Sequence, residues 1–421
     1  MPRTYNAPVS RQRVVVTGSG LVTPLGVDVA STWRGLVEGR SGIGPITRFD
    51  PAENETRFAG EVKDFDVERY LDRKEARRMD RFTQYAIAAS KQALDQSGLQ
   101  IGDQNCERVG AIIGTGIGGI ETLSSQFKVL HEKGPRRLSP FLSTMMLGNM
   151  ASGQVGIQFG CRGPNFATVS ACASGAHAIG EGLEIIRRGG ADALLVGGGE
   201  APIVEIGVGN FNAMRALSTR NDEPEKASRP FDAERDGFVV AEGGGVLVIE
   251  AHDHARARGA TILAELVGYG ASADAHHVSS PPESGAGAAR SMRQALEQAG
   301  VRPEEVGYLN AHATSTGIGD IAETNAIKEV FGEHAGRLPI SSTKSMTGHL
   351  LGAAGAIETI FCILAMREGC LPPTINQEHP DPACDLDYIA NRARPARVSV
   401  ALNNSFGFGG QNASLVVRLP D

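Results

Sequence analysis

The sequence predicts a mixed α/β protein built from two similar halves, and two observations support this prediction. The eight residues QALDQSGL at 92–99 recur almost unchanged as QALEQAGV at 294–301. Each copy ends a segment with apolar and small residues at helical spacing, and a short polar connection and a strand-like run follow each. Chance similarity of two helix ends would explain the repeated octapeptide but not the matching elements around it. We therefore interpret the chain as an internal duplication.

The first half supplies its elements in a simple order. A helix-like segment stops at Gly98, because glycine readily adopts the left-handed backbone that ends a helix. A strand-like run follows at residues 109–113, and a second run at residues 166–172 enters a segment rich in Gly and Ala. We expect the next helix to begin at Ala173, and its small residues on every side are typical of a buried helix.

The second half repeats that order. Gly300 ends the second helix-like segment, and strand-like runs follow at residues 306–310 and 338–344. A second buried helix is expected from about Gly348. Parallel strands joined by right-handed helical crossovers would give two layered α/β halves. We expect the chain to divide into a tail at residues 1–12, a first half at residues 13–255 and a second half at residues 256–421.

The composition argues against several classes of protein. The longest apolar stretches, such as residues 193–196 and 244–249, are far too short to span a membrane, and residues 1–13 lack the apolar core of a secretory signal. The six cysteines form no CxxC pair and no metal-like spacing with histidine, so we expect a reduced, cytoplasmic protein without membrane insertion. The net charge of −7 argues against a dedicated nucleic-acid binder.

A glycine-rich motif, GTGIGG at residues 114–119, fits the dinucleotide-binding pattern GxGxxG and follows a strand-like run. A dinucleotide site also needs an acidic residue at the end of the next strand, where it faces a ribose. The following segment offers only Glu132, within a polar and basic loop, and no strand is legible between residues 120 and 132. The motif is therefore a weak signal, and we do not predict a nicotinamide or flavin site.

Cys172 lies where the second strand-like run meets the first buried helix, in the sequence VSACASG at residues 169–175. The positive end of a helix dipole favours the thiolate and raises the reactivity of a thiol. Small neighbours leave room for a substrate, and backbone N–H groups there could stabilise an oxyanion. A buried structural cysteine is the commoner alternative, and it fits Cys362, within an apolar helical run, better than Cys172. We therefore predict that Cys172 is a nucleophile.

Two histidines occupy comparable glycine-rich junctions in the second half. His312 lies in NAHATSTGIGD, directly after a strand-like run, and His349 lies in KSMTGHLLGAAG, where the second buried helix is expected to begin. Protonation of an imidazole is disfavoured at a helix N-terminus, so a histidine there can act as a neutral hydrogen-bond donor near pH 7. A Cys/His/His group without metal spacing predicts covalent thioester or acyl chemistry.

These motifs resemble those of one family, the β-ketoacyl-acyl-carrier-protein synthases of dissociated fatty acid synthesis, and in particular the type II synthase. The resemblance runs from about Arg13 to the C-terminus. It is carried by VVVTGSGLVTPLG at 14–26, RALSTRND at 215–222, RPFDAERDGF at 229–238 and NSFGFGG at 404–410. It implies the thiolase-like fold, in which two duplicated halves form five layers (α/β/α/β/α), usually as a homodimer.

The resemblance also implies a reaction. Cys172 would take an acyl chain from the phosphopantetheine thioester of an acyl carrier protein, and His312 and His349 would hold the malonyl thioester while it loses CO₂. The resulting carbanion would attack the acyl-cysteine and give a 3-oxoacyl-acyl-carrier-protein. The backbone N–H groups of Cys172 and Phe408 would form the oxyanion hole, and Phe408 would act as a gate for the acyl chain. This acyltransferase reaction requires no cofactor.

Further positions carry over from the resemblance. Lys344 resembles a buried lysine that orders the site and is paired with Asp320 and Glu323. The substrate-binding positions match Ile117, Phe211, Thr314 and Thr316. The positions that dock the acidic carrier protein match the basic residues Lys74, Arg77, Arg78, Arg136, Arg137 and Arg215. A structural monovalent cation, Na⁺ or K⁺, would be held by Asn310, Glu358, Asn403 and Asn404.

The chain departs from the family pattern at Ala313, Ile318 and Gln411, and in residues 143–149 of the expected dimer interface. These departures leave acyl chain length and partner choice open. A type II polyketide ketosynthase, working as a heterodimer with a chain-length factor, shares all the catalytic residues and is the alternative. A non-catalytic chain-length subunit would lack Cys172, and a thiolase would need a second catalytic cysteine near the C-terminal glycines. A binding module has no need for a Cys/His/His group.

Overall fold

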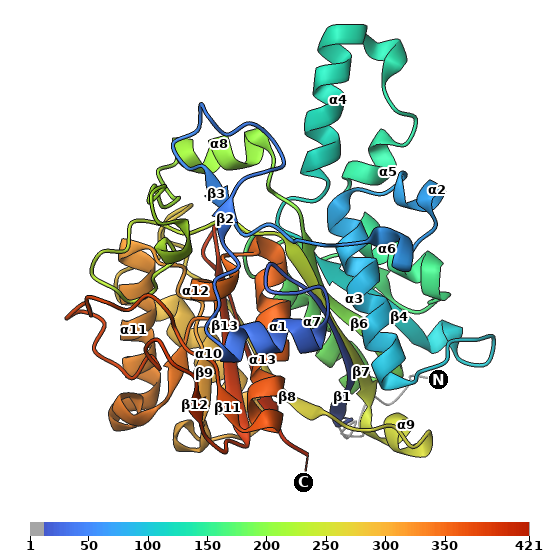
Figure 1. Ribbon diagram of the computed structural model, residues 1–421. Coiled ribbons are helices and arrows are strands. Elements are labelled where there is room, and N and C mark those ends of the chain that lie inside the picture. Colours follow the sequence, from blue (N-terminus) through green and yellow to red (C-terminus); the bar gives the residue numbers. More distant parts are fainter. Residues whose placement is uncertain (1–11, 421) are drawn as a thin grey trace.

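The computed structural model describes residues 12–420, and ten of its strands form one continuous sheet (Figure 1). The strand order is β10-β9-β13-β14-β8-β1-β7-β6-β4-β5, so that each half of the chain contributes five neighbouring strands. The first five are β1 (Val14–Val22), β4 (Val109–Gly114), β5 (Asn165–Phe166), β6 (Ala193–Glu200) and β7 (Gly243–Ala251). The second five are β8 (Ala264–Ala273), β9 (Tyr308–Asn310), β10 (Ile340–Ser341), β13 (Val400–Gly407) and β14 (Gln411–Arg418).

The two sets of strands repeat the same pairing pattern, which confirms the predicted two-half architecture. In each set the two outermost pairs are parallel: β4 with β5 and β6, and β9 with β10 and β13. The inner pairs are antiparallel, and the sets join where Val15 and Val16 of β1 face Glu265 and Ala264 of β8. The division near residue 255 stays a prediction, and residues 1–11 of the predicted tail lie outside the described residues.

Helices form the remaining layers. The buried helices α7 (Ser174–Arg187) and α13 (Ala354–Glu368) pack against each other and against strands of both sets. Helix α3 (Arg81–Ser97) covers the first set of strands and α10 (Ala286–Ala299) covers the second. As the repeated octapeptide predicts, α3 and α10 both end at a left-handed glycine, Gly98 and Gly300.

Some predicted boundaries differ from the structure. The strand-like runs at residues 166–172 and 338–344 contain only the short strands β5 and β10. The second buried helix begins at Ala354, and the prediction that it starts near Gly348 is wrong. Gly348 instead ends the short helix α12 (Lys344–Thr347), because its backbone adopts a φ of 69°. His349 therefore lies in the connection between α12 and α13, where it forms an isolated parallel bridge with Val240, and not at a helix N-terminus.

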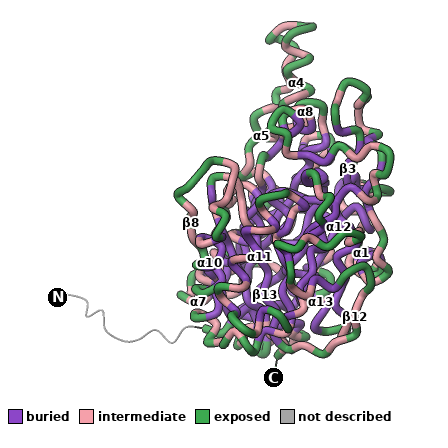
Figure 2. The backbone as a smooth tube through the Cα atoms, turned by 90° about the vertical axis from the view of Figure 1, so that its left-hand side faces the viewer, coloured by how far each residue is buried: buried purple, intermediate pink, exposed green. Residues whose placement is uncertain are grey.

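Smaller elements surround this body. Helix α4 (Ile120–Lys133) projects away from it and buries only Thr122 of its side chains (Figure 2). None of the helices in residues 12–420 combines the length and the apolar character needed to cross a bilayer. The other elements are α1 (Val29–Val37), α2 (Arg73–Ala76), α5 (Leu142–Met146), α6 (Met150–Phe159), α8 (Glu205–Ala213), α9 (His252–Ala257), α11 (Gly317–Phe331), β2 (Gly44–Pro45), β3 (Phe58–Ala59), β11 (Cys370–Leu371) and β12 (Arg394–Pro395).

Candidate active site

Cys172 lies on a tight turn just before α7. The preceding residue, Ala171, has a φ of 49°, a left-handed conformation that is costly for a residue with a Cβ. The hydroxyl of Ser174 braces this turn, because it accepts a hydrogen bond from the backbone N–H of Ser170 (2.8 Å) and donates one to the carbonyl of Ala171 (2.7 Å). The strained turn directs the buried Cys172 side chain toward the second half of the chain.

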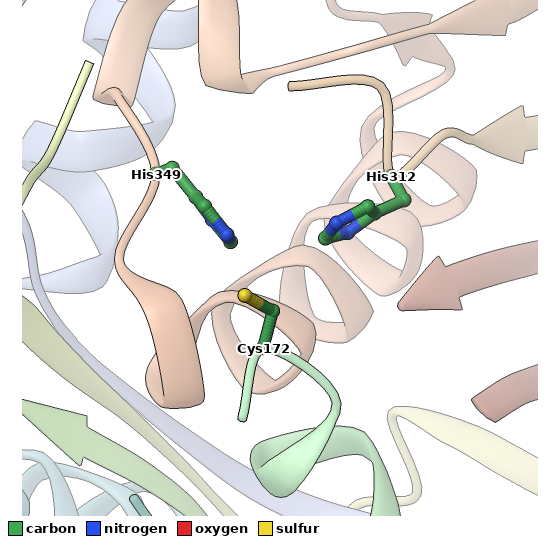
Figure 3. Close-up of side chains that lie close together, drawn as sticks. All are labelled: Cys172, His312 and His349. Atoms are coloured by element: carbon green, nitrogen blue, oxygen red, sulfur yellow. The ribbon is translucent and has the colours of Figure 1, made fainter. Parts of the chain in front are cut away.

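The structure brings His312 and His349 to this cysteine, as the sequence predicts (Figure 3). His312 follows β9, and His349 lies in the connection after α12, where its backbone N–H donates to the carbonyl of Val239 (2.7 Å). The Cys172 sulfur and one nitrogen of each imidazole lie within 4.8 Å of one another. The two imidazole rings are nearly perpendicular, with centroids 5.3 Å apart. One thiol and two imidazoles thus share a single small space.

Both imidazoles are neutral at pH 7. Burial and the nearby positive charge of Lys344 lower the pKa values of His312 and His349 well below 6.5. The sequence also predicts neutral imidazoles, but from a helix N-terminus, whereas the structure attributes the effect to burial and Lys344. Nδ1 of His312 and both ring nitrogens of His349 are buried without a hydrogen-bond partner among the described residues. These nitrogens are therefore free to bind a polar group of a substrate.

The thiol is protonated in the resting site. Burial raises the pKa of Cys172 to about 12, although Lys344 and the backbone N–H groups of Phe408 and of Cys172 itself favour the thiolate. Burial therefore opposes the thiolate that the helix N-terminus favours, and desolvation outweighs the favourable groups. The backbone N–H groups of Cys172 and Phe408 both act on the Cys172 sulfur, and their use as an oxyanion hole stays a prediction.

Lys344 is buried, as predicted, but its partner differs from the prediction. Its ammonium group lies 2.5 Å from the carboxylate of Glu358 on α13. Asp320 instead faces Arg235 (3.6 Å) and accepts hydrogen bonds from the backbone of Phe231 and Ser315. Within residues 12–420, no ion pair joins Lys344 to the predicted partners Asp320 and Glu323. Both predicted partners lie on α11, where backbone N–H groups already occupy their oxygens.

Glu323 orders the loop that carries His312. Its carboxylate accepts hydrogen bonds from the backbone N–H groups of His312 (2.9 Å) and Ala313 (2.7 Å), and from the amide of Asn404 (3.0 Å). Three donors on one buried carboxylate fix the position of the loop. Glu323 therefore orders the loop through hydrogen bonds, and although it forms no ion pair with Lys344, the positive charge of Lys344 lowers its pKa against the rise that burial causes.

The thiol and imidazoles open into a cavity of about 820 Å³. All the residues predicted to bind the substrate or to gate its entry line this cavity: Ile117, Phe211, Thr314, Thr316 and Phe408. The sequence reasoning did not identify two further aromatic residues, Phe238 and Phe406. The ring centroid of Phe238 lies 5.5 Å from that of His349, and the ring centroid of Phe406 lies 5.7 Å from that of His312. Phe238 belongs to the quoted segment at 229–238, but nothing in its spacing indicated that it would reach the histidine.

Two of the four predicted cation ligands are neighbours in the sheet. Asn310 of β9 and Asn403 of β13 face each other in the parallel pair, and both have buried side-chain oxygens without a hydrogen-bond partner among the described residues. Oε2 of Glu358 is also buried without a hydrogen bond there, while Oε1 lies 2.5 Å from Lys344. Asn404 does not fit, because successive strand residues point to opposite faces, and its oxygen accepts from Ser414 (2.8 Å). The donor set suits a monovalent cation with Asn404 left out.

The glycine-rich motif at 114–119 binds a side chain of the protein itself. It lies between β4 and α4, as in a dinucleotide site, but the Glu200 carboxylate accepts the backbone N–H groups of Gly116 (2.5 Å) and Ile117 (3.2 Å). A carboxylate in this position leaves no room for a phosphate. The sequence reasoning did not identify Glu200, although an acid that ends an apolar strand, ALLVGGGE, was a readable signal.

The predicted docking residues lie in two clusters and at one separate position. The guanidinium of Arg78 lies 4.7 Å from the ring centroid of Phe141, so α2 adjoins the segment before α5, whereas residues 135–137 follow α4 at the outer end of its projection (Figure 1). Lys74, Arg77, Arg136 and Arg137 are exposed, and Arg78 is half-buried. Arg215 is also exposed but lies apart from these clusters, at the cavity.

Two family models match the chain. The model "Beta-ketoacyl synthase, N-terminal domain" covers residues 11–255, and "Beta-ketoacyl synthase, C-terminal domain" covers residues 263–378. A curated protein of a Synechocystis species, named 3-oxoacyl-[acyl-carrier-protein] synthase 2, is 51% identical over 412 residues, or 98% of this chain and 99% of that protein.

Solved structures are similar over nearly the whole chain. One is described as the ishigamide ketosynthase/chain length factor, with a TM-score of 0.91 and 37% identity over 98% of this chain and 100% of that chain. A second is a type II PKS acyl-carrier protein in complex with its ketosynthase bound to the hexaketide. It gives a TM-score of 0.90 and 36% identity over 98% and 100% of the two chains. These likenesses confirm the predicted thiolase-like fold.

Proposed function

The chain belongs to the beta-ketoacyl synthase family, and from this premise we propose that it is a decarboxylating condensing enzyme of fatty acid elongation. It joins an acyl chain held on Cys172 to the two-carbon unit of malonyl-acyl-carrier-protein, and the products are 3-oxoacyl-acyl-carrier-protein and CO₂. The observation that carries the proposal is the thiol of Cys172 beside two neutral imidazoles, those of His312 and His349, in one cavity.

In the first half-reaction, the Cys172 sulfur attacks the carbonyl carbon of an acyl-carrier thioester. A new S–C bond forms, the bond to the phosphopantetheine sulfur breaks, and the thiol proton leaves with that sulfur. The backbone N–H groups of Cys172 and Phe408 stabilise the tetrahedral oxyanion. Because the resting thiol is protonated, the proton must move as the sulfur attacks, and a neutral imidazole within 4.8 Å of the sulfur can accept it.

In the second half-reaction, the free nitrogens of His312 and His349 donate hydrogen bonds to the thioester carbonyl of the malonyl group. The C–C bond to the carboxylate breaks, CO₂ leaves, and the electron pair forms an enolate whose oxygen these donors stabilise. The enolate carbon attacks the acyl-cysteine carbonyl, and collapse of the adduct releases the Cys172 sulfur, which takes up a proton. Neutral imidazoles suit this role, since an imidazole that is already neutral keeps an N–H to donate.

The sequence identities favour fatty acid elongation over polyketide condensation. The relative named 3-oxoacyl-[acyl-carrier-protein] synthase 2 is 51% identical, whereas the ishigamide ketosynthase and the type II PKS ketosynthase are 37% and 36% identical. The catalytic residues are common to both pathways, so the difference lies in the cavity and in the partner. We therefore assign this chain to fatty acid elongation and keep the polyketide ketosynthase as the alternative.

An acyl carrier protein is the protein partner. A similar ketosynthase is solved in complex with its acyl-carrier protein. The chain has a net charge of −7, yet two segments carry exposed basic residues: α2 with Lys74 and Arg77, and residues 135–137 with Arg136 and Arg137. Basic residues on an otherwise acidic protein attract an acidic partner to that part of the surface, because the acidic remainder of the surface repels it. We propose that these two basic segments dock the carrier protein.

We propose further that the chain forms a homodimer through the edge strand β5. This strand ends the ten-stranded sheet, and the large apolar side chains of Phe166, Val169 and Ile157 on and beside it are exposed. An unprotected edge with exposed apolar side chains is suited to pair with a second copy of the chain. Sedimentation of the purified chain tests this proposal, and we expect a dimer. If the chain is a monomer in the absence of a chain-length factor, the heterodimer is favoured instead.

The proposal includes a structural role for a bound Na⁺ or K⁺ at Asn310, Asn403 and Glu358. Such a cation would satisfy the buried side-chain oxygens of the two asparagines. It would add a positive charge near Glu358, which already faces Lys344. Replacing K⁺ by a large organic cation in the buffer should lower the melting temperature if the site is used.

Mass spectrometry tests the central proposal. Incubation of the purified chain with an acyl-acyl-carrier-protein should add one acyl group at Cys172, and malonyl-acyl-carrier-protein should then release CO₂ and discharge that group. Labelling of another cysteine, such as Cys362, would overturn the assignment. Acyl carriers of graded chain length, offered with and without a chain-length factor, distinguish fatty acid elongation from the polyketide alternative.

A further inference from the structure

A buried glutamate that the reaction does not use lies close to the reactive cysteine. Glu200 is the last residue of β6, and its side chain is fully buried. Its carboxylate accepts four hydrogen bonds, from the hydroxyl of Thr115 (2.9 Å) and the backbone N–H groups of Gly116 (2.5 Å), Ile117 (3.2 Å) and Gly352 (2.9 Å). All four donors are uncharged, so dipoles hold this carboxylate in place.

These donors belong to two segments that reach the cavity from different halves of the chain. The loop after β4 ends in Ile117, which lines the cavity, while Gly352 follows His349 by three residues. A Cβ on Gly116 or Gly352 would lie 2.9 or 2.6 Å from a carboxylate oxygen, so both backbones approach Glu200 more closely than any larger residue allows. The carboxylate therefore fastens the Ile117 loop to the 3-10 helix Leu351–Ala353, which follows His349.

The charge of Glu200 also acts on the thiol. The charged and titratable groups around Cys172 are Glu200, Lys344, His312 and His349. Lys344 favours the thiolate and Glu200 opposes it, while both imidazoles are neutral. Burial raises the pKa of Glu200 to about 7, so this carboxylate is ionised throughout the alkaline range in which the thiol titrates.

We propose that Glu200 is a positioning residue with two effects on the active site. Through Ile117 it fixes one wall of the acyl cavity, and through its negative charge it adds to the effect of burial and further opposes ionisation of the Cys172 thiol. The first effect rests on the proposed function, because it is read out as acyl chain-length preference. The second effect does not, because the ionisation of a thiol can be measured with a small alkylating reagent and no substrate.

The pH profile of Cys172 alkylation by iodoacetamide tests the charge effect. Glu200→Gln removes a negative charge beside the thiol, which stabilises the thiolate and lowers the pKa of Cys172. The alkylation profile should therefore move to lower pH by roughly one to two units, the size expected for one close charge. Peptide mass mapping assigns the reaction to Cys172 and not to the other cysteines.

Glu250→Gln is the matched control. Glu250 is equally buried on the neighbouring strand β7, where its carboxylate accepts hydrogen bonds from Arg258, His254 and Thr17. Its charge is not among the groups that act on Cys172. This variant loses a buried carboxylate of the same kind, so it should be less stable but keep the wild-type alkylation profile.

Thr115→Val tests the positioning effect, and this test remains available if the Glu200→Gln protein does not fold. It removes one neutral donor and keeps the charge of Glu200. The alkylation profile should stay in place, while the looser Ile117 loop should broaden the range of acyl chain lengths that the enzyme accepts.

The outcomes separate this inference from the proposed function. An unmoved profile in Glu200→Gln, or an equal shift in Glu250→Gln, would overturn the charge effect. An unchanged chain-length range in Thr115→Val would overturn the positioning effect. If Glu200→Gln shifts the profile but no acyl-carrier protein acylates Cys172, the proposed function fails and the charge effect stands.

Discussion

Lys344 and Glu358 form an ion pair at 2.5 Å in which both side chains are buried. The positive charge of Lys344 helps to keep His312 and His349 neutral. Glu358 has its pKa raised to about 7 by burial, and Lys344 opposes that rise. The lysine thus links the electrostatic state of the imidazoles to a carboxylate on the central helix α13.

Replacing Lys344 with Met should affect stability and pH dependence together. Removing one partner of a buried ion pair leaves the other charge uncompensated, and we expect a loss of about 3–5 kcal/mol in the free energy of unfolding, measured by urea denaturation. Loss of the positive charge also raises the pKa values of His312 and His349, so the acid limb of malonyl decarboxylation should move to higher pH.

The control for this variant is Lys328→Ala. Lys328 forms an exposed ion pair with Asp385, and such pairs contribute about 0–1 kcal/mol. It should leave both the unfolding free energy and the decarboxylation profile close to those of the wild type. A Lys344→Met protein with an unmoved acid limb would show that burial alone keeps the histidines neutral.

Cys172→Ala and Cys172→Gln should separate the two half-reactions. Neither variant can form an acyl-enzyme, so condensation should fall to background in both. Cys172→Gln mimics the acylated side chain and leaves His312 and His349 in place, so we expect it to retain release of CO₂ from malonyl-acyl-carrier-protein. The experiment measures the release of CO₂ and, in the same reaction, the amount of 3-oxoacyl product.

Cys362→Ala is the matched control for these variants. Cys362 is buried in α13, where its sulfur lies 3.9 Å from the carbonyl of Leu402, and burial raises its pKa. We expect this variant to be acylated and to condense as the wild type does. Loss of acylation in Cys362→Ala with full acylation of Cys172→Ala would reverse the assignment of the nucleophile.

The sequence revealed the fold and the reactive groups because both depend on local patterns. The repeated octapeptide ends α3 and α10 with the same glycine geometry, and a cysteine and two histidines in glycine-rich junctions indicated acyl chemistry. The pairing of Lys344 could not be read in this way. Several buried acids were available, and the choice of Glu358 depends on how α13 packs against α12, which no local pattern encodes.

Glu200 shows a second limit of sequence reasoning. The motif at 114–119 was not predicted to bind a dinucleotide, because no acid followed at the end of the next strand, but the sequence did not indicate what it binds instead. The residue that binds its N–H groups comes from β6, which lies beside β4 in the sheet but more than 80 residues later in the chain. Only the parallel pairing of these two strands places the carboxylate at the loop.

Replacing Ile117 with Phe should shorten the accepted acyl chains. Ile117 lines the cavity that contains Cys172, and a larger ring there fills space that a long chain would occupy. We expect turnover to fall at least tenfold with long acyl chains and to change little with short ones. A loss of this size is expected when an apolar pocket can no longer hold one or two methylene groups of the substrate. Acyl-carrier substrates of graded length provide the measurement.

Leu123→Phe is the control for this enlargement. Leu123 lies on the projecting helix α4, is exposed and does not line the cavity. It should leave the chain-length profile unchanged. Equal loss of activity at every chain length in Ile117→Phe would mean that this residue packs the loop and does not limit the acyl chain.

Reversing the charges of Arg136 and Arg137 to Glu should weaken docking of the carrier protein. Both side chains are exposed at residues 135–137, next to α4, and far from the thiol. Charges at the rim of an interface act on association and are screened by salt. We expect a higher KM for the acyl-carrier substrate, a flatter dependence of kcat/KM on ionic strength, and nearly unchanged activity with an acyl-pantetheine surrogate.

Arg392→Glu with Arg397→Glu makes the same change in net charge on the other side of the molecule, beside β12 (Figure 1). This control should keep the wild-type KM and salt dependence, because the charges lie away from both basic segments. If the two double variants raise KM equally, net charge and not a local surface governs association. If Arg136→Glu with Arg137→Glu slows the surrogate as much as the carrier-bound substrate, these arginines support the fold of the α4 region, and docking must be assigned to other residues.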